Sequence, residues 1–236
     1  MTTGPMSGAQ MEELALFYEE VRKAQSQPLW LMGDENLTTE PKPRTVAFMW
    51  KWEDLRPLMN RAAQLIPVEK AERRVLVFAN PGLKGRGSAT TTLMANLQII
   101  NPGEVARTHR HTPSAFRVVV EGTGAYTAVD GEKTYMNVGD FITTPNWTWH
   151  DHGNEGTAPM VWLDGLDVPL VNALEVGFYQ QYQEQRQPLT KPDELSLRLY
   201  GAGTLTPTWQ RPTGIHSPLL NYKWERSYEV LSRLAA

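Results

Sequence analysis

The sequence of 236 residues contains no cysteine. This absence excludes disulfide bonds, thiolate nucleophiles, cysteine-ligated zinc fingers and iron–sulfur clusters. A metal ion would therefore have to be held by nitrogen or oxygen atoms. Long apolar runs are also lacking, because even the longest, such as Val75 to Ala79, have only five residues, against about 20 for a membrane-spanning helix. We expect no membrane as a partner.

Neither sign of charge dominates the chain. Its 23 basic and 26 acidic residues give a formal net charge of -3, and no basic tract occurs that would neutralise a run of phosphates. Nucleic acid is therefore not an expected partner. The N-terminal residues Met1 to Gly4 begin no basic segment followed by an apolar one, so we predict no secretory signal. The expected compartment is the cytoplasm.

The first 72 residues are predicted to be a helical region. Apolar residues recur at three- and four-residue spacing from Met11 to Val21 and again from about Glu53 to Ile66, which is typical of amphipathic helices. Pro57 falls in the first turn of the second helix, where proline is tolerated. The segment between the two helices, Pro28 to Pro43, is expected to be irregular.

From Val75 the hydrophobic period changes to two, and Gly, Pro, Asn and Asp separate the runs. The predicted strands are 75–79, 91–100, 117–121, 124–129, 133–138, 140–143, 149–152 and 160–164. Eight short strands without helices between them indicate a closed antiparallel barrel or a jelly roll, and they argue against a parallel sheet. The fold is therefore predicted to be mainly β.

The pattern loosens after Asp167 and ends in a short amphipathic helix near Tyr222 to Leu234. These observations predict three parts: a helical region over residues 1–72, a barrel over 73–167, and a connector with a C-terminal helical segment over 168–236. Terminal helices with exposed apolar faces favour a partner chain, so we expect a homo-oligomer.

The five histidines are unevenly placed, because four of them fall between His109 and His152. His109 and His111 are two residues apart, so on a strand both imidazoles point to one face. His150 and His152 repeat that spacing. Two such pairs in one barrel interior predict a metal site, although a single pair is usually incidental. Four ligands would close a tetrahedral structural site and three would leave positions open for a substrate; the spacing alone leaves both alternatives open.

These residues resemble the two sequence motifs of cupins. The matching positions are Gly103, His109, His111 and Gly122 in the first motif, and Gly139, Pro145, His150 and Asn154 in the second. The glutamate that usually follows the second histidine as a ligand is Ala115 here. The resemblance therefore implies a double-stranded β-helix barrel whose metal is held by three neutral ligands, His109, His111 and His150.

The longer segments 101–117, 121–127 and 140–153 are similar to gentisate 1,2-dioxygenases, to which salicylate and 1-hydroxy-2-naphthoate dioxygenases are related. This resemblance implies an Fe(II) cofactor and a small aromatic acid as substrate. The implied reaction uses O₂ to open gentisate (2,5-dihydroxybenzoate), or a related hydroxybenzoate, between the carboxyl- and hydroxyl-bearing carbons; gentisate would give maleylpyruvate.

Family members carry a second barrel after the iron-bearing one, and this sequence stops where the second barrel would begin. We therefore expect the chain to correspond to the N-terminal cupin domain. A non-catalytic ligand-binding cupin or an inactive truncated fragment stays open as the alternative. A cupin isomerase or hydrolase with Mn²⁺ or Zn²⁺ is disfavoured by Ala115, because harder metals prefer carboxylate ligands.

Three residues are candidate catalytic groups. Arg117 follows His111 by an even offset and is expected to face the interior, where it would pair with a substrate carboxylate or form a salt bridge with Asp164. The resemblance assigns His152 to the substrate hydroxyl or to proton transfer, with a buried structural histidine as the alternative. Asp164 alternates with apolar neighbours and is expected to orient His152 or Arg117.

Weaker candidates for the substrate pocket precede the histidines. Arg73 and Gln98 match positions that line the pocket in the family, although such residues are more often found at a rim or on the surface. Trp147 and Trp149, beside His150, would either form an aromatic wall of the pocket or take part in ordinary barrel packing.

Overall fold

A computed structural model describes residues 6–33, 38–202, 214 and 216–235. Residues Met1 to Gly4, on which the prediction about a secretory signal rests, lie outside this range. The chain divides into two compact units, residues 1–43 and residues 44–236. No helix in the described part of the chain is long and apolar enough to cross a membrane.

The first unit contains the predicted N-terminal helix. This helix, α1 (Gly8–Lys23), begins with a capping box in which Ser7 and Gln10 satisfy each other's backbone N–H groups. A short 3₁₀ turn, η1 (Leu29–Leu31), follows it. The helix prediction for this segment is confirmed, with the helix extending further at both ends.

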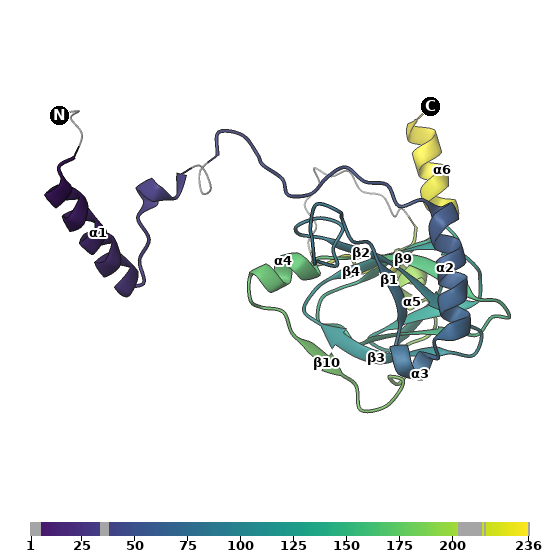
Figure 1. The fold of residues 1–236 in the computed structure, drawn as a ribbon. Helices are drawn as coiled ribbons and strands as arrows, with labels where there is room; N and C mark the ends of the chain where they lie inside the picture. Colours follow the sequence, from purple (N-terminus) through teal and green to yellow (C-terminus); the bar gives the residue numbers. More distant parts are fainter. Residues whose placement is uncertain (1–5, 34–37, 203–213, 215, 236) are drawn as a thin grey trace. The chain divides into compact units, whose positions relative to one another are not determined.

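The second unit opens with the other predicted helix, α2 (Trp52–Leu65), and a single turn, α3 (Val68–Ala71). Two carboxylates, Glu53 and Asp54, lie in the first turn of α2, where they interact favourably with the helix dipole. Met59 of α2 is fully buried against an apolar cluster of Leu97, Ile99 and Val161. Figure 1 shows α2 lying along the strands of the barrel.

Two antiparallel sheets face each other in the second unit (Figure 1). In sheet order, the six-stranded sheet contains β1 (Arg74–Val77), β2 (Met94–Ile100), β9 (Met160–Leu166), β4 (Ala115–Glu121), β7 (Phe141–Thr144) and β11 (Asn221–Tyr222). The five-stranded sheet contains β10 (Tyr179–Gln181), β3 (Val105–His111), β8 (His150–Asn154), β5 (Ala125–Val129) and β6 (Glu132–Tyr135). The predicted mainly-β cupin fold is confirmed.

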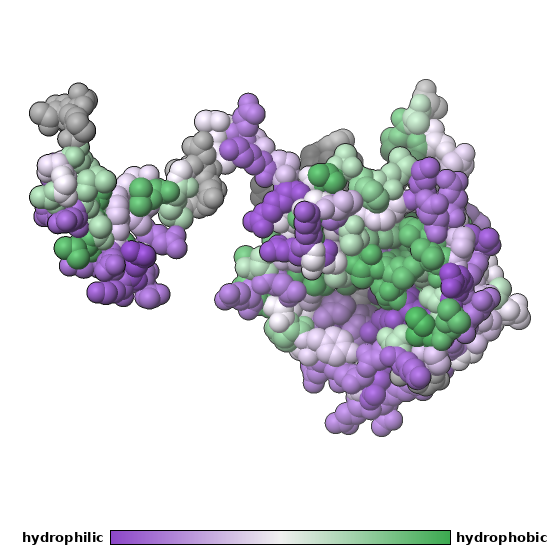
Figure 2. All heavy atoms as spheres, viewed as in Figure 1, coloured by the Kyte–Doolittle hydropathy of each residue, from purple (hydrophilic) through white to green (hydrophobic). Residues whose placement is uncertain are grey.

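The barrel interior is divided between an apolar part and a polar part. The apolar part is a buried cluster of Ile100, Val119, Ala125, Met136, Ile142, Met160 and Trp162. Figure 2 shows hydrophobic residues also on the barrel surface beside α2. The polar part contains the four clustered histidines, which all come from β3 and β8 of the five-stranded sheet.

The strand predictions differ from the structure in several places. Strand β3 was absent from the eight predicted ranges because its sequence is mostly polar and does not alternate. The strand predicted over 149–152 ends too early, because Gly153 and Asn154 also belong to β8. Strand β2 starts at Met94 rather than at Thr91.

The C-terminal segment, predicted to be a connector, also adds strands to the barrel. It adds β10 to the edge of β3 and β11 to the edge of β7, and it contains the helices α4 (Val168–Ala173), α5 (Leu195–Tyr200) and α6 (Trp224–Leu234). The start of α6 is fixed by Asp140, which accepts a hydrogen bond from Trp224 N and pairs with Lys223 at 3.0 Å. Short edge strands such as β10 lack a hydrophobic pattern, which is why the sequence did not reveal them.

Candidate metal centre

Three histidines from two neighbouring strands converge inside the barrel. His109 and His111 lie on β3 and His150 lies on β8, where His109 and His150 are register partners. The candidate ligand nitrogens of the three side chains all lie within 4.8 Å of one another. The prediction that strand spacing places these imidazoles on one face therefore agrees with the geometry.

Backbone carbonyls two residues away fix the tautomers of two of these rings. The Nδ1 atom of His111 lies 2.7 Å from Pro113 O, and that of His150 lies 2.9 Å from Thr148 O. Because a carbonyl only accepts, Nδ1 of these two rings must carry the proton, which leaves their Nε2 lone pairs available to a metal. His109 Nδ1 lies 3.2 Å from Arg107 O and also contacts Arg73 Nη2, so this ring is positioned by both groups.

The site's polar atoms fit a bound cation. His150 Nε2 is buried and has no hydrogen-bond partner among the described residues, and an orphaned buried acceptor of this kind requires an explanation. Burial lowers the pKa of His150 and also lowers the pKa of His109 to about 2, with nearby Arg73 adding to the effect on His109. The rings therefore stay neutral, the form that ligates metals.

His152 lies beside this group without belonging to it. Its ring centroid is 6.1 Å from that of His150, and it is not among the three histidines whose ligand atoms converge. His152 Nδ1 is 2.9 Å from the hydroxyl of Thr127, which is also within 3.2 Å of Met136 Sδ. When that hydroxyl donates to sulfur, His152 Nδ1 donates to the hydroxyl and Nε2 keeps its lone pair. The geometry favours three ligands over four.

Arg117 and Asp164 form a buried ion pair on the opposite sheet. Their side chains are 5% and 7% exposed, and Arg117 Nε lies 3.1 Å from Asp164 Oδ1. Arg117 Nη1 donates to Thr144, while Trp162 donates to the second carboxylate oxygen of Asp164 at 3.1 Å. Arg117 Nε and Asp164 Oδ1 are buried and make no hydrogen bond among the described residues despite their ion pair, so the guanidinium keeps donor capacity for an anion.

One cavity of about 250 Å³ brings all of the predicted site residues together. The predicted residues that line it are Arg73, Gln98, His109, His111, Arg117, His150, His152 and Asp164. Five further residues complete the lining: Val75, Met94, Asn96, Leu166 and Tyr179. The alternation along β2 points Met94 and Asn96 the same way as Gln98, a signal that the sequence contains. Tyr179 comes from β10, which the sequence did not predict.

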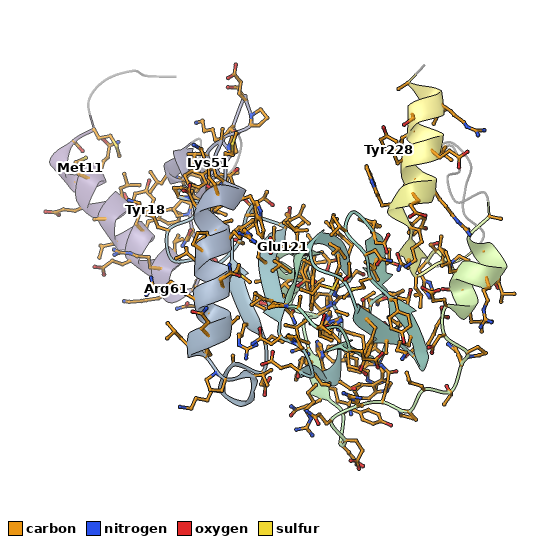
Figure 3. The ribbon with its side chains drawn as sticks, turned by 90° about the vertical axis from the view of Figure 1, so that its right-hand side faces the viewer. Met11, Tyr18, Lys51, Arg61, Glu121 and Tyr228 are labelled. Carbon is orange, nitrogen blue, oxygen red and sulfur yellow. The ribbon has the colours of Figure 1, made fainter. Side chains whose placement is uncertain are left out.

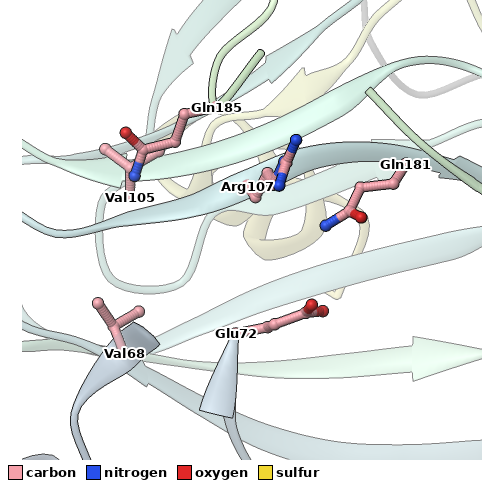
Figure 4. A pocket seen from close by; sticks show the side chains of 6 residues that line it. All are labelled: Val68, Glu72, Val105, Arg107, Gln181 and Gln185. Carbon is pink, nitrogen blue, oxygen red and sulfur yellow. The ribbon is translucent and has the colours of Figure 1, made fainter. Parts of the chain in front are cut away.

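Arg73 lines the histidine cavity and contacts the backbone of a residue that lines a second one. Its Nη2 atom donates to Arg107 O at 2.9 Å and contacts His109 Nδ1. The second cavity, of about 410 Å³, is lined by residues that include Glu72, Arg107 and Gln181. Figure 4 shows the polar ends of these three side chains facing the same space.

Trp147 and Trp149 do not line the histidine cavity. Instead, the guanidinium carbon of Arg110 lies 4.2 Å and 4.3 Å from their ring centroids. The same guanidinium donates to Gln180 of β10 at 2.7 Å. This cation–π arrangement joins β3, the loop before His150 and β10, so the two tryptophans support the site from outside.

The buried histidines predict how the stability of the metal-free chain depends on pH. Burial lowers the pKa of His109, His111, His150 and His152 from 6.5, so below that pH the unfolded chain takes up protons that the folded chain does not. Asp164 acts in the opposite direction, because burial raises its pKa to about 6 and the folded chain then binds a proton that the unfolded chain does not. Between about pH 7.5 and about pH 5.5 we expect the free energy of unfolding to fall by at least about 3 kcal/mol. Urea titrations measure it, and a constant value would contradict burial of neutral imidazoles.

Comparisons with known proteins extend these observations. Residues 96–167 match the cupin domain family. The chain is 47% identical over 218 residues to a gentisate 1,2-dioxygenase of Aquipseudomonas alcaligenes, covering 92% of this chain and 62% of that protein. It is 39% identical to a 1-hydroxy-2-naphthoate 1,2-dioxygenase of Nocardioides sp. (strain KP7), covering 98% of this chain and 60% of that protein.

The structure of a salicylate 1,2-dioxygenase from Pseudoaminobacter salicylatoxidans, determined with gentisate, is similar across the fold. It superimposes with a TM-score of 0.86 at 34% identity, covering 98% of this chain and 63% of the other. The chain therefore spans a little over 60% of the length of these relatives. With its cupin barrel and its histidine triad, this chain belongs to the gentisate 1,2-dioxygenase family of the cupin superfamily.

Proposed function

We propose that this chain is an Fe(II)-dependent dioxygenase that uses O₂ to open the ring of gentisate or a related hydroxybenzoate between the carboxyl- and hydroxyl-bearing carbons. The observation that carries the proposal is one cavity that joins three convergent histidines to a buried arginine. The membership of the chain in the gentisate 1,2-dioxygenase family supports the same reaction.

The donor set suits Fe(II). His109, His111 and His150 are neutral, so the ligands leave the full charge on a divalent cation and favour an anionic, chelating substrate. When bound, the iron would supply the redox chemistry that joins an aromatic ring to O₂, which amino-acid side chains do not provide. Three ligands, rather than four, leave coordination positions for both reactants.

The chain's own residues would bind and orient the aromatic acid. Arg117, held by Asp164 and Thr144, offers its guanidinium to the substrate carboxylate. Arg73 and Gln98 line the same cavity and would make further contacts with the substrate. Taking two charged side chains out of water is costly unless they are paired, so the ion pair between Arg117 and Asp164 keeps the arginine in place before substrate binds.

His152 is suited to handle the proton of a substrate hydroxyl. It lines the cavity next to the triad, and burial together with Arg117 lowers its pKa well below the usual value. With Nδ1 directed at Thr127, the Nε2 lone pair can accept a hydrogen bond from a phenol and orient it. We assign His152 to this contact rather than to metal binding.

The proposal is tested by O₂ uptake. The chain is prepared without oxygen, loaded with Fe(II) and supplied separately with gentisate, salicylate and 1-hydroxy-2-naphthoate in air. We expect uptake with at least one acid, together with near-ultraviolet absorbance from a ring-opened product. Binding of the acids without uptake would indicate a non-catalytic cupin and would overturn the proposal.

The organisation of the chain is also proposed. We assign residues 1–72 to a helical region, 73–167 to the metal-binding barrel and 168–236 to a connector with its helical segment. All of the predicted site residues, from Arg73 to Asp164, fall in the middle part.

We further propose that the chain forms a homo-oligomer. Met11 of α1 and Tyr228 of α6, both labelled in Figure 3, are each 58% exposed, and apolar helix faces of this kind favour burial against another chain. Light scattering during gel filtration measures the mass.

A further inference from the structure

One residue beside the metal centre has an unfavourable backbone conformation. Trp147, in the turn between β7 and β8, has a φ of 59°. This left-handed region is costly for a residue with a Cβ atom, and a bulky side chain is rarely found there. The described part of the chain has six non-glycine residues with positive φ, and Trp147 is the only aromatic one among them. Such a conformation persists only where the surrounding structure holds it.

Contacts of the indole ring hold this turn. The guanidinium carbon of Arg110 lies 4.2 Å from the centroid of the Trp147 ring, and the ring centroid of Phe178 lies 4.5 Å from it. Arg110 is fixed in turn by Gln180, whose Oε1 accepts hydrogen bonds from two of its nitrogens at 2.9 Å and 2.7 Å. Cation–π and aromatic contacts are favourable, so the ring compensates for the backbone conformation at Trp147.

The backbone of the same turn reaches a candidate metal ligand. Trp147 N donates a hydrogen bond to His111 O at 2.8 Å. The register between β3 and β8 ends at the pair of His109 and His150, so Trp147 connects His111 to the segment that leads into His150. His111 is only partly buried, whereas the other two histidines of the triad are buried. The position of His111 relative to His150 therefore depends on the turn at Trp147.

We infer that Trp147 is a positioning residue for the metal centre. Its ring, packed on Arg110 and Phe178, holds a left-handed turn whose N–H group sets the position of His111 relative to His150. This inference rests on the metal site of the proposed function, and it extends that site to a residue that does not line the histidine cavity. Removing groups that orient metal ligands from outside typically weakens metal binding by about 10- to 100-fold.

The test measures binding of Co(II) to the metal-free full chain. Co(II) is the probe because its visible absorption bands change with the number and geometry of its ligands. We expect Trp147→Ala to weaken Co(II) binding by about tenfold or more and to change the absorption bands of the bound ion. Trp147→Phe keeps an aromatic ring against Arg110 and Phe178, so it should recover most of the affinity and the original bands.

Trp147→Gly separates positioning from stability. Glycine adopts the left-handed region without a steric cost, so this variant should unfold at a higher temperature than Trp147→Ala. It also lacks the ring, so we expect it to bind Co(II) as weakly as Trp147→Ala does. A purely structural role would change unfolding temperature and affinity together. The glycine variant also tests the inference if the alanine variant does not fold.

Trp224→Ala is the matched control for loss of an indole ring. Trp224 packs on Tyr228 of α6 with ring centroids 5.4 Å apart, and it does not line the histidine cavity. This variant should keep the Co(II) affinity and the absorption bands of the unmodified chain. Unchanged Co(II) binding in Trp147→Gly would overturn the inference. So would Trp147→Phe binding no more tightly than Trp147→Ala, or an equal loss in Trp224→Ala.

The outcome also separates this inference from the proposed function. If the unmodified chain binds one Co(II) and the three Trp147 variants bind it equally well, only the role of Trp147 fails. If the unmodified chain binds no Co(II), or if His150→Ala binds it as tightly, the metal site of the proposed function fails. The role of Trp147 then fails with it.

Discussion

Replacing His150 with alanine is expected to abolish metal binding and O₂ uptake together. His150 is 1% exposed, its Nδ1 is held by Thr148 O, and its Nε2 points without a partner into the space shared with His109 and His111. Two remaining imidazoles would hold a divalent cation weakly. Because the metal supplies chemistry that the side chains lack, activity should fall by about a thousandfold or more. Iron content after gel filtration and O₂ uptake are the two measurements.

The fifth histidine provides a matched control. His216 is exposed, its Nδ1 lies 3.0 Å from Ser217 O, and it does not line the histidine cavity, so His216→Ala should keep full metal content and full activity. Circular dichroism establishes that the His150→Ala variant is folded. Retention of one iron per chain in folded His150→Ala would show that the ligand set is wrong, whatever its activity.

Replacing Arg117 with alanine should leave the metal in place and raise the KM for the aromatic acid by about a hundredfold. A charge-assisted hydrogen bond between buried groups contributes about 1.5 to 3 kcal/mol, and the Arg117 guanidinium lines the cavity where it would make one. The candidate metal ligands lie on the other sheet. Steady-state kinetics and iron analysis on the same preparation separate the two effects.

The Arg117→Ala variant should also be less stable, because it leaves Asp164 buried without its cation. Arg117→Lys restores a charge without the planar donors, so it should recover stability more fully than KM. Arg56→Ala is the control for loss of an arginine ion pair, since Arg56 and Glu121 pair at 2.6 Å on the surface, away from the cavity. A large KM effect from Arg56→Ala, or none from Arg117→Ala, would contradict the assignment of the carboxylate site.

The sequence was sufficient for those features that follow from local periodicity. Side chains two residues apart on a strand share a face, and this rule alone placed His109 with His111 and His150 with His152. The turn residues between short apolar runs indicated an antiparallel barrel, which the two sheets confirm. The choice between three and four ligands depended on ring positions and was open until the structure separated His152 from the triad.

The position of Arg117 was predicted for a reason that the structure corrects. The even offset from His111 was interpreted as one continuing strand, but β3 ends at His111 and Arg117 lies on β4 of the other sheet. It nevertheless faces inward, because β4 follows its own alternation from the buried Ala115. The agreement therefore comes from the barrel, in which both sheets point alternate residues inward.

Residues contributed by sheet pairing could not be predicted from local sequence. Tyr179 reaches the cavity because β10 adds to the edge of β3, with Tyr179 opposite His111. No hydrophobic period indicates a three-residue edge strand. Asn96 differs, because alternation with Gln98 implies its orientation. That its Oδ1 has no hydrogen-bond partner among the described residues is visible only when every neighbouring strand is in place.

The most direct test of this account is a titration of the metal-free chain with Fe(II), with gentisate present, while O₂ uptake is followed. The three-histidine site predicts that uptake is absent without iron, rises in proportion to added Fe(II) and stops rising at one iron per chain. Uptake that is independent of iron would contradict the account. So would one tightly bound iron per chain without uptake of O₂ in the presence of gentisate, salicylate or 1-hydroxy-2-naphthoate.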